Sequence, residues 1–296
     1  MAGKKKDKTL VFGLPKGSLE EATLALFKKA GWRIRVEERS LTPTVDDPEL
    51  SCLLFRAQEM AGYMEKGVLD AGVTGRDWVV EQGAKVKEIT ALCYSKSSFR
   101  KVRWVVAVPE NSPVRRVRDL AGKLIVTEAV NMTRRYLRQR GIKAEVEFSW
   151  GATEIKPLFV ADAVVELTET GSSLRAHNLR VLDTVMESET VLIANRDAYK
   201  DRWKRTKIDT ISLMLQGALE AEKKAGLKMN VPRNKAERIF KILPAMHTPT
   251  ISGLSDPEWL SLEVVIDKGL VRELVPKLKK AGATGIIEYP LNKVIP

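Results

Sequence analysis

The sequence contains few of the residues that build disulfides and metal sites. Only two of its 296 residues are cysteine, Cys52 and Cys93, and two are histidine, His177 and His247. The cysteine spacing permits one disulfide but matches no CxxC or zinc pattern, and we expect two free thiols in a reducing compartment. The two histidines are too few and too far apart to support a metal centre or histidine-based catalysis.

Long apolar segments are also missing. No stretch approaches the ~18 apolar residues that a membrane span requires. The opening MAGKKKDK leads directly into a strand-like segment instead of a signal peptide. We therefore expect a cytoplasmic protein with no membrane partner. The 44% hydrophobic content still suffices for packed cores.

Basic residues exceed acidic ones by 50 to 38, which gives a formal charge of +12. Such a surplus favours anionic partners, whether nucleic acid, an anionic membrane surface or phosphorylated small molecules. The basic residues are spread along the chain and no nucleic-acid-binding motif accompanies them. We expect phosphorylated ligands and no nucleic-acid partner.

Strand-like and helix-like segments alternate through most of the chain, which predicts an α/β fold with mostly parallel sheets. The form of Ser18 followed by Glu21 predicts a capping box at the start of a helix. Four tryptophans, Trp78, Trp104, Trp150 and Trp259, are expected in cores. Strands are predicted at Thr9–Leu14, Cys52–Phe55, Ala71–Val73, Val102–Val108, Lys123–Thr127, Ala144–Phe148, Val160–Val165 and Val191–Ala194.

Two polar seams, Ser95–Arg100 and Val185–Thr190, predict that the chain leaves a first lobe, forms a second and returns. We assign residues 8–97 with 184–222 to lobe I, 98–183 to lobe II and 223–296 to a separate domain. The last domain shows the β-α-β-β-α-β order of the ferredoxin-like unit. A cleft between two lobes is a common ligand site.

The segment Glu154–Leu174 is the most informative part of the sequence. A strand ends in Glu166, and a loop with glycine and hydroxyl residues follows, then a short helix. Such a loop offers backbone N–H groups to a phosphate, and an acid at the strand end can accept hydrogen bonds from ribose hydroxyls. The pattern suits a phosphoribosyl pocket, although an ordinary capped turn has the same local form.

These segments resemble the landmarks of the ATP phosphoribosyltransferases in their long form. Residues 151–195 resemble the signature region, Leu14–Gly17 the opening loop and Asp70–Trp78 a second loop. Val106–Pro109 is similar to the start of the second lobe. The tail, Pro249–Ser255 with Gly282–Tyr289, resembles the regulatory domain of the long form.

The resemblance implies a two-lobed, periplasmic-binding-protein-like catalytic core and a C-terminal ferredoxin-like (ACT-like) regulatory domain. It implies transfer of phosphoribosyl from phosphoribosyl pyrophosphate to N1 of ATP, which releases pyrophosphate in the first step of histidine biosynthesis. It further implies feedback inhibition by L-histidine, Mg²⁺ as cofactor and a homo-oligomer between dimer and hexamer.

The same resemblance suggests which residues serve each part of the reaction. Catalysis is expected from Glu166 and Lys16. Contacts to phosphoribosyl pyrophosphate are expected from Glu166, Thr168, Glu169, Thr170, Gly171, Ser172, Ser173 and Leu174. Contacts to the nucleotide are expected from Lys16, Gly17, Arg56, Thr74, Gly75, Arg76 and Asp77, and contacts to histidine from Asn230, Thr250, Ser252 and Leu254. Mg²⁺ is expected to be carried by the substrate, with Glu154 as the one candidate protein contact.

The chain departs from the family pattern in places. Ser18 stands where many members have arginine, Glu166 replaces aspartate and Ser173 replaces threonine, and the interval from Glu154 to Glu166 is one residue shorter and lacks a glycine. We expect these differences to shift the geometry of the substrate pocket and to leave the enzymatic activity intact.

Other readings stay open at this stage. Arg76 and Asp77 could pair with each other or cap a helix, and Asp162 could make structural hydrogen bonds. The tail could serve assembly alone. A non-enzymatic binding protein and an inactive regulatory paralogue are the rival functions.

Overall fold

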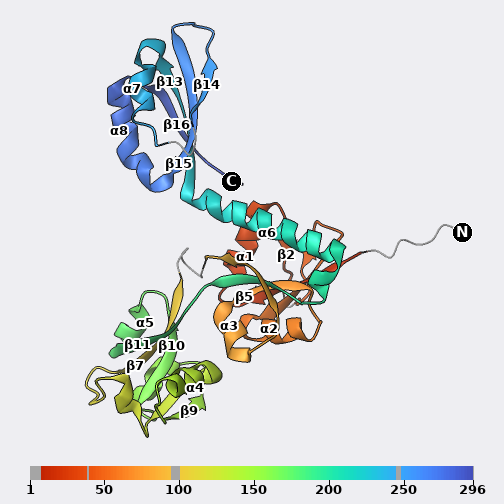
Figure 1. The fold of residues 1–296 in the computed structure, drawn as a ribbon, viewed down its shortest axis with the longest axis vertical. Helices are drawn as coiled ribbons and strands as arrows, with labels where there is room; N and C mark the ends of the chain where they lie inside the picture. The colour runs from red at the N-terminus through yellow and green to blue at the C-terminus, as the bar shows by residue number, and fades with distance from the viewer. Residues whose placement is uncertain (1–7, 39, 95–100, 245–247, 296) are drawn as a thin grey trace, which may run out of the picture. The chain divides into compact units, whose positions relative to one another are not determined.

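The computed structural model describes residues 8–38, 40–94, 101–244 and 248–295 (Figure 1). Two compact units make up the chain, one of Met1–Ala25 with Trp32–Ser212 and one of Leu26–Gly31 with Leu213–Pro296. The predicted seam at Ser95–Arg100 lies outside the described residues. The predicted boundaries of lobe I, lobe II and the last domain stay predictions.

The first sheet of the larger unit has the order β4-β1-β5-β12-β6. Its strands are β1 (Leu10–Lys16), β4 (Leu50–Arg56), β5 (Ala71–Gly75), β6 (Lys87–Leu92) and β12 (Thr190–Ala194), accompanied by α1 (Glu20–Ala30), α2 (Ala57–Glu65) and α3 (Arg76–Gln82). A small ribbon of β2 (Ile34–Arg35) and β3 (Thr44–Val45) precedes β4. Apolar side chains such as Met60, Leu69 and Val191 form its core. Since β4, β1 and β5 run parallel, their carboxyl ends lie at one edge.

The second sheet has the order β11-β7-β10-β8-β9. Its strands are β7 (Val102–Pro109), β8 (Leu124–Thr127), β9 (Glu145–Phe148), β10 (Ala163–Thr168) and β11 (Leu179–Ser188), with α4 (Val130–Gln139), α5 (Ser172–Ala176) and the 3-10 helices η1 (Val117–Leu120) and η2 (Thr153–Leu158). A third 3-10 helix, η3 (Ala198–Lys200), follows β12 of the first sheet. The core includes Trp104, Ile125 and Leu137. Strands β9, β8 and β10 run parallel, so their carboxyl ends also share one edge.

The chain returns from the second sheet to the first where β11 ends at Ser188 and β12 begins at Thr190 (Figure 1). Two α/β lobes joined by such a crossing confirm the predicted periplasmic-binding-protein-like core. The sheets are mixed instead of mostly parallel, because β12 pairs antiparallel with β5 and β6, and β7 antiparallel with β10 and β11.

The predicted strand 160–165 begins three residues later, at Ala163. Pro157 lies within η2, and Val160 is 66% exposed. Asp162 ends the turn by accepting the Leu124 N–H and pairing with Lys123. Residues 160–162, which were predicted in the strand because they follow an apolar pattern, therefore belong to the turn before β10.

Two other local predictions also differ from the structure. Helix α1 begins at Glu20, and the Gly17 N–H donates to Glu20 Oε2 at 3.2 Å, so the capping carboxylate comes one residue earlier than the predicted Glu21. Strand β11 was placed at a seam because its polar residues hide the periodicity.

The C-terminal unit carries a four-stranded antiparallel sheet of order β14-β15-β13-β16. Its elements follow helix α6 (Arg202–Lys223) and are β13 (Lys224–Pro232), η4 (Arg233–Lys235), α7 (Ala236–Phe240), β14 (Thr250–Gly253), β15 (Trp259–Asp267), η5 (Lys268–Leu270), α8 (Val271–Ala281) and β16 (Thr284–Pro290). The core packs Ile239 of α7 and Leu278 of α8 against Met229 and Leu262. This β-α-β-β-α-β order confirms the predicted ferredoxin-like domain.

None of the helices in the described ranges combines the length and apolar character needed to cross a membrane.

Candidate active site

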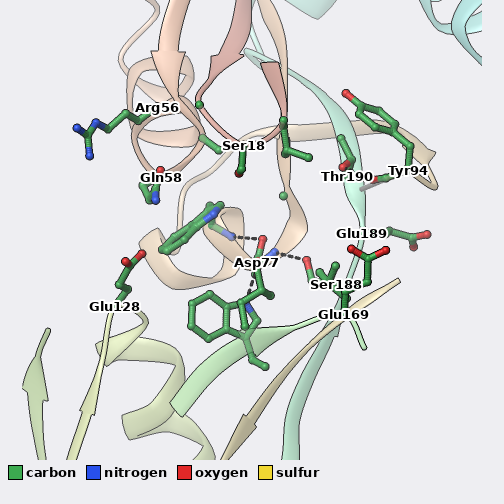
Figure 2. Close-up of a pocket in the computed structure, with 18 of the residues that line it drawn as sticks. Ser18, Arg56, Gln58, Asp77, Tyr94, Glu128, Glu169, Ser188, Glu189 and Thr190 are labelled. Carbon is green, nitrogen blue, oxygen red and sulfur yellow. Dashed lines mark hydrogen bonds between the residues drawn. The ribbon is translucent and has the colours of Figure 1, made fainter. Parts of the chain in front are cut away.

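A cleft of about 660 Å³ lies where the carboxyl ends of the parallel strands of both lobes meet (Figure 2). Lobe I contributes residues at the ends of β1, β4 and β5, and lobe II contributes residues at the ends of β8 and β10. Its lining comprises Lys16, Gly17, Ser18, Leu19, Arg56, Ala57, Gln58, Gly75, Asp77, Trp78 and Tyr94, then Val102, Trp104, Glu128, Glu166, Leu167, Glu169, Ser188, Glu189 and Thr190. The strand ends of an α/β sheet are a usual place for a ligand.

One edge of the cleft is basic. Lys16 and Arg56 are Cα partners in the parallel ladder of β1 and β4, so the two cations end neighbouring strands. Both side chains are exposed. Gly17 follows with φ 96°, a conformation that glycine adopts without a steric cost. The edge therefore offers positive charge and accessible backbone to an anionic ligand.

The opposite edge is acidic. Glu166 and Glu169 come from β10 and its loop, and Glu128 follows β8. Sequence analysis missed Glu128, although it directly follows β8. The strand that carries Glu166 continues two residues beyond that residue, to Thr168. It also missed Gln58 and Glu189, which the local pattern around them does not distinguish from surface residues.

Burial, together with the neighbouring carboxylates of Glu154 and Glu128, raises the pKa of the Glu166 carboxyl to about 7. Hydrogen bonds from the Leu167 N–H and the Thr153 hydroxyl act in the opposite direction and do not offset burial. Without a ligand this carboxyl thus exchanges its proton near neutral pH. A carboxyl with such a shift inside a cleft is a good candidate for a functional group.

The Glu166 shift predicts a pH-dependent stability. The folded protein holds this proton between the ordinary pKa of 4.5 and about 7, so stability falls as pH rises through that window. Glu166→Gln removes the cost of the buried charge, and we expect the variant to be about 3 kcal/mol more stable than the parent near pH 8, with little difference below about pH 4. Thermal unfolding at both pH values, with the exposed Glu145→Gln as control, measures this. A difference independent of pH would contradict the assignment.

The loop Thr168–Leu174 is ordered by its own contacts. The Gly171 N–H donates to Thr168 Oγ1 at 2.8 Å, and Thr170 Oγ1 donates to Ser172 Oγ at 3.0 Å. Ser173 Oγ donates to Glu154 Oε1 at 2.8 Å. Leu174 is buried in the lobe II core, which fixes the end of the loop. Glu166, Leu167 and Glu169 line the cleft, whereas Thr168 and residues 170–174 are not part of its lining.

Arg175 is a further cation beside this loop that sequence analysis did not select. A Cβ atom placed on Gly171 would lie 2.9 Å from Arg175 Nη1. The guanidinium therefore lies next to the backbone that we expect to hold a phosphate. Its position one residue beyond Leu174, outside the predicted loop, explains why the motif did not include it.

Three residues that were predicted to contact the nucleotide, Thr74, Arg76 and Asp77, form hydrogen bonds or ion pairs with other residues of the protein. The Thr74 hydroxyl donates to Ala57 O at 2.7 Å and is fully buried. Arg76 binds Glu88 at 2.6 Å and Glu189 at 2.5 Å. The contacts of Arg76 join it to β6 and to the crossing between the lobes, and not to its neighbour Asp77, which was the alternative reading.

Asp77 is buried between the lobes (Figure 2). Its carboxylate accepts the Trp104 Nε1–H at 2.6 Å and the Trp78 N–H at 3.0 Å, and its own N–H donates to Ser188 Oγ at 3.0 Å. Burial raises the pKa of Asp77. The side chain thus holds the junction of the two lobes, although it borders the cleft.

The predicted histidine contacts lie in the C-terminal sheet. Ser252 is opposite Ser261, and Ser261 is opposite Asn230, so three polar residues form a row across β14, β15 and β13. Their neighbours Met229 and Leu262 belong to the core on the other face. The row therefore occupies the face away from the helices. Thr250 and Leu254 are exposed at β14 and just beyond it.

Family models match both parts of the chain. The model described as ATP phosphoribosyltransferase matches residues 56–217, and the one described as HisG, C-terminal domain, matches residues 221–293. The chain is 57% identical over 291 residues to the ATP phosphoribosyltransferase of Thermodesulfovibrio yellowstonii, covering 98% of this chain and 100% of the relative. It is 55% identical over 289 residues to that of Chlorobium luteolum, covering 98% of each.

A solved structure agrees with the core. A chain of the ATP phosphoribosyl transferase (HisG:HisZ) complex from Thermotoga maritima superimposes with a TM-score of 0.62 and 28% identity, covering 72% of this chain and 99% of that one. Two α/β lobes around a cleft with a basic and an acidic edge define an enzyme class that handles phosphorylated substrates. With the family matches and 57% identity, the chain belongs to the ATP phosphoribosyltransferase family, in its long form.

Membership in this family establishes the chemistry in outline. The chain is a transferase whose substrates are ATP and phosphoribosyl pyrophosphate, at the first step of histidine biosynthesis. Enzymes of the family need a divalent metal ion.

Proposed function

We propose that the two substrates bind on opposite edges of the cleft, with ATP phosphates on lobe I and phosphoribosyl pyrophosphate on lobe II. The observation that carries this proposal is that cations end β1 and β4 while carboxylates end β8 and β10 around one cavity. Phosphates require the cations, and ribose hydroxyls require acceptors. N1 of ATP then meets C1' of the ribose between the edges.

On lobe II, Glu166 accepts hydrogen bonds from the ribose hydroxyls, and the loop Thr168–Leu174 holds the 5'-phosphate. Backbone N–H groups and the hydroxyls of Thr170, Ser172 and Ser173 are the donors, with Glu169 beside them. The loop supports this role because its glycine and its buried Leu174 fix the backbone before a ligand arrives. Arg175 adds a positive charge next to it.

On lobe I, Lys16, Gly17 and Arg56 hold nucleotide phosphates, and Gly75 lets the chain pass close to the ligand. We assign Thr74, Arg76 and Asp77 to supporting this edge through the partners described above. Lys16 also acts in catalysis, since it can neutralise charge that develops on the departing pyrophosphate.

The reaction forms the bond between N1 and C1' as the bond from C1' to pyrophosphate breaks. Positive charge builds at C1' and negative charge on the leaving group, so positioning and electrostatic stabilisation supply the catalysis. The Glu166 carboxylate, held by the Thr153 hydroxyl and the Leu167 N–H, lies on the side where the positive charge develops.

Mg²⁺ is the metal that we propose. Among the described residues no group of three or more histidine, cysteine, aspartate or glutamate side chains could hold a metal ion. We therefore propose an ion that is bound mainly by substrate phosphates, with Glu154 as the one candidate protein contact. When bound, the ion neutralises charge on the pyrophosphate oxygens.

The C-terminal domain is proposed to bind histidine and to inhibit the enzyme within a homo-oligomer between dimer and hexamer. Asn230 and Ser252, aligned through Ser261, supply polar groups for an amino acid, with Thr250 and Leu254 beside them. The Thermotoga maritima chain is matched almost completely by 72% of this chain, so the additional domain is not needed for the shared core.

The test mixes the protein with ATP, phosphoribosyl pyrophosphate, Mg²⁺ and pyrophosphatase, and follows the near-ultraviolet change of an N1-substituted adenine. We expect a signal that requires both substrates and that histidine suppresses. Asn230→Ala and Ser252→Ala should each raise the half-inhibiting histidine concentration about tenfold, a loss of one hydrogen bond. Ser255→Ala, exposed in the same loop, is the matched control. If histidine did not reduce the turnover, the C-terminal domain would serve assembly and not inhibition.

A further inference from the structure

We propose that Trp150 is the stacking surface for the adenine ring of ATP, which makes it a specificity residue of the known reaction. The inference builds on the proposed placement of the substrates. It starts from an unexpected position, because Trp150 was predicted in a core and its side chain is instead 61% exposed. An exposed tryptophan beside a nucleotide cleft has a flat apolar face to offer.

Topology places Trp150 on the edge that carries the acidic residues. Strands β9, β8 and β10 are parallel neighbours, with Phe148 in register with Thr127. Glu128 follows the end of β8, and Trp150 follows the end of β9 by two residues. The indole thus lies one strand outward from Glu128 and two strands outward from Glu166, the proposed ribose acceptor. The base of the second substrate would lie on this side of the ribose.

The indole also contacts the opposite lobe. The Arg56 guanidinium carbon lies 4.5 Å from the centroid of the Trp150 ring, and Arg56 lines the cleft. A planar cation stacked on an indole occupies the kind of surface that a purine can share or replace. Phosphates near Arg56 and a base on Trp150 would belong to one nucleotide.

The loop that carries Trp150 is held firmly. Gly151 has φ 69° and Ala152 has φ 47°, so a non-glycine residue keeps a left-handed conformation two residues after the tryptophan. Beneath it Ser149 and Thr153 are buried and joined at 3.4 Å, and Lys156 Nζ donates to Ser149 Oγ. Thr153 also bonds Glu166. The loop therefore fixes the indole relative to the ribose acceptor.

Trp78, which lines the cleft, is a weaker candidate for stacking. Its ring packs edge-on against Trp104 with centroids 5.6 Å apart and an interplanar angle of 88°. That contact and its partial burial serve the lobe II core.

The experiment compares Trp150→Ala, Trp150→Phe and the control Phe159→Ala, an 80% exposed aromatic on the same lobe. We expect Trp150→Ala to raise KM for ATP at least about tenfold, the range for one lost base stack, with KM for phosphoribosyl pyrophosphate and the melting temperature nearly unchanged. Phenylalanine should restore most of the affinity, and Phe159→Ala should resemble the parent. ATP should quench tryptophan fluorescence in the parent and much less in Trp150→Phe.

Unchanged ATP affinity in Trp150→Ala, or equal rises in both KM values, would overturn the proposal. A loss that phenylalanine does not restore would assign Trp150 to loop structure and also overturn it. Equilibrium ATP binding is measured on every variant without phosphoribosyl pyrophosphate. If the proposed placement of the ribose were wrong, the kcat of Glu166→Gln would show it. The equilibrium binding of ATP to the Trp150 variants does not depend on that placement.

Discussion

Glu166→Gln is expected to lower kcat about 100-fold, the usual cost of removing one group that stabilises transition-state charge. Glutamine keeps the size of the side chain but loses the negative charge that faces the developing positive charge at C1'. It also turns one acceptor into a donor where two ribose hydroxyls need acceptors. Initial rates at saturating ATP, phosphoribosyl pyrophosphate and Mg²⁺ measure the effect.

The control for this variant is Glu145→Gln, an exposed carboxylate on β9 of the same lobe. Its kcat should stay within about twofold of the parent, since it lies on the surface. If Glu166→Gln kept at least one-third of the parent turnover, the proposed role at the ribose would be wrong. A pH profile adds a second readout, because the parent should gain activity as the carboxyl with a pKa of about 7 ionises, and the variant should not.

Gly171→Val is expected to raise KM for phosphoribosyl pyrophosphate about 100-fold and KM for ATP much less. Several hydrogen bonds to the 5'-phosphate would be weakened together, and their summed contribution to binding is of this size. Gly171 has φ 74°, which a β-branched residue strongly resists. Its new side chain would also displace Arg175, whose Nη1 would lie 2.9 Å from the added Cβ. Both effects disturb the backbone that holds the 5'-phosphate.

Gly122→Val separates backbone strain from ligand binding. Gly122 lies on the same lobe with φ 71°, and no atom lies within 4 Å of an added Cβ. Both variants should lose similar stability, on the order of 1–2 kcal/mol, from the unfavourable conformation. Steady-state kinetics and melting temperatures then compare them. If the two variants had equal KM values for phosphoribosyl pyrophosphate, the proposal that the loop Thr168–Leu174 binds this substrate would be wrong.

Much of the fold is readable from local patterns. The strands β1, β5 and β12 near the cleft follow from apolar runs with clear stops, because most of their residues are buried. The β-α-β-β-α-β order of the last domain follows from similar local patterns. Strand β11 was not predicted in full because its polar residues hide its periodicity. The turn at Pro157–Asp162 was not predicted because the apolar residues Val160 and Ala161 suggest a strand. There, a 3-10 helix and the hydrogen bond from Leu124 to Asp162 decide against a strand.

The sequence by itself indicated the class of the protein, through its resemblance to the family, and the order of most of its elements. Neighbouring residues encode these elements through apolar runs, glycine conformation and strand ends. Tertiary structure alone decided which groups share the cleft. Asp77 meets Trp104 27 residues away, and Arg76 meets Glu189 113 residues away. The exposure of Trp150 was decided in the same way, because burial depends on what the folded chain brings near, and local sequence does not contain that information.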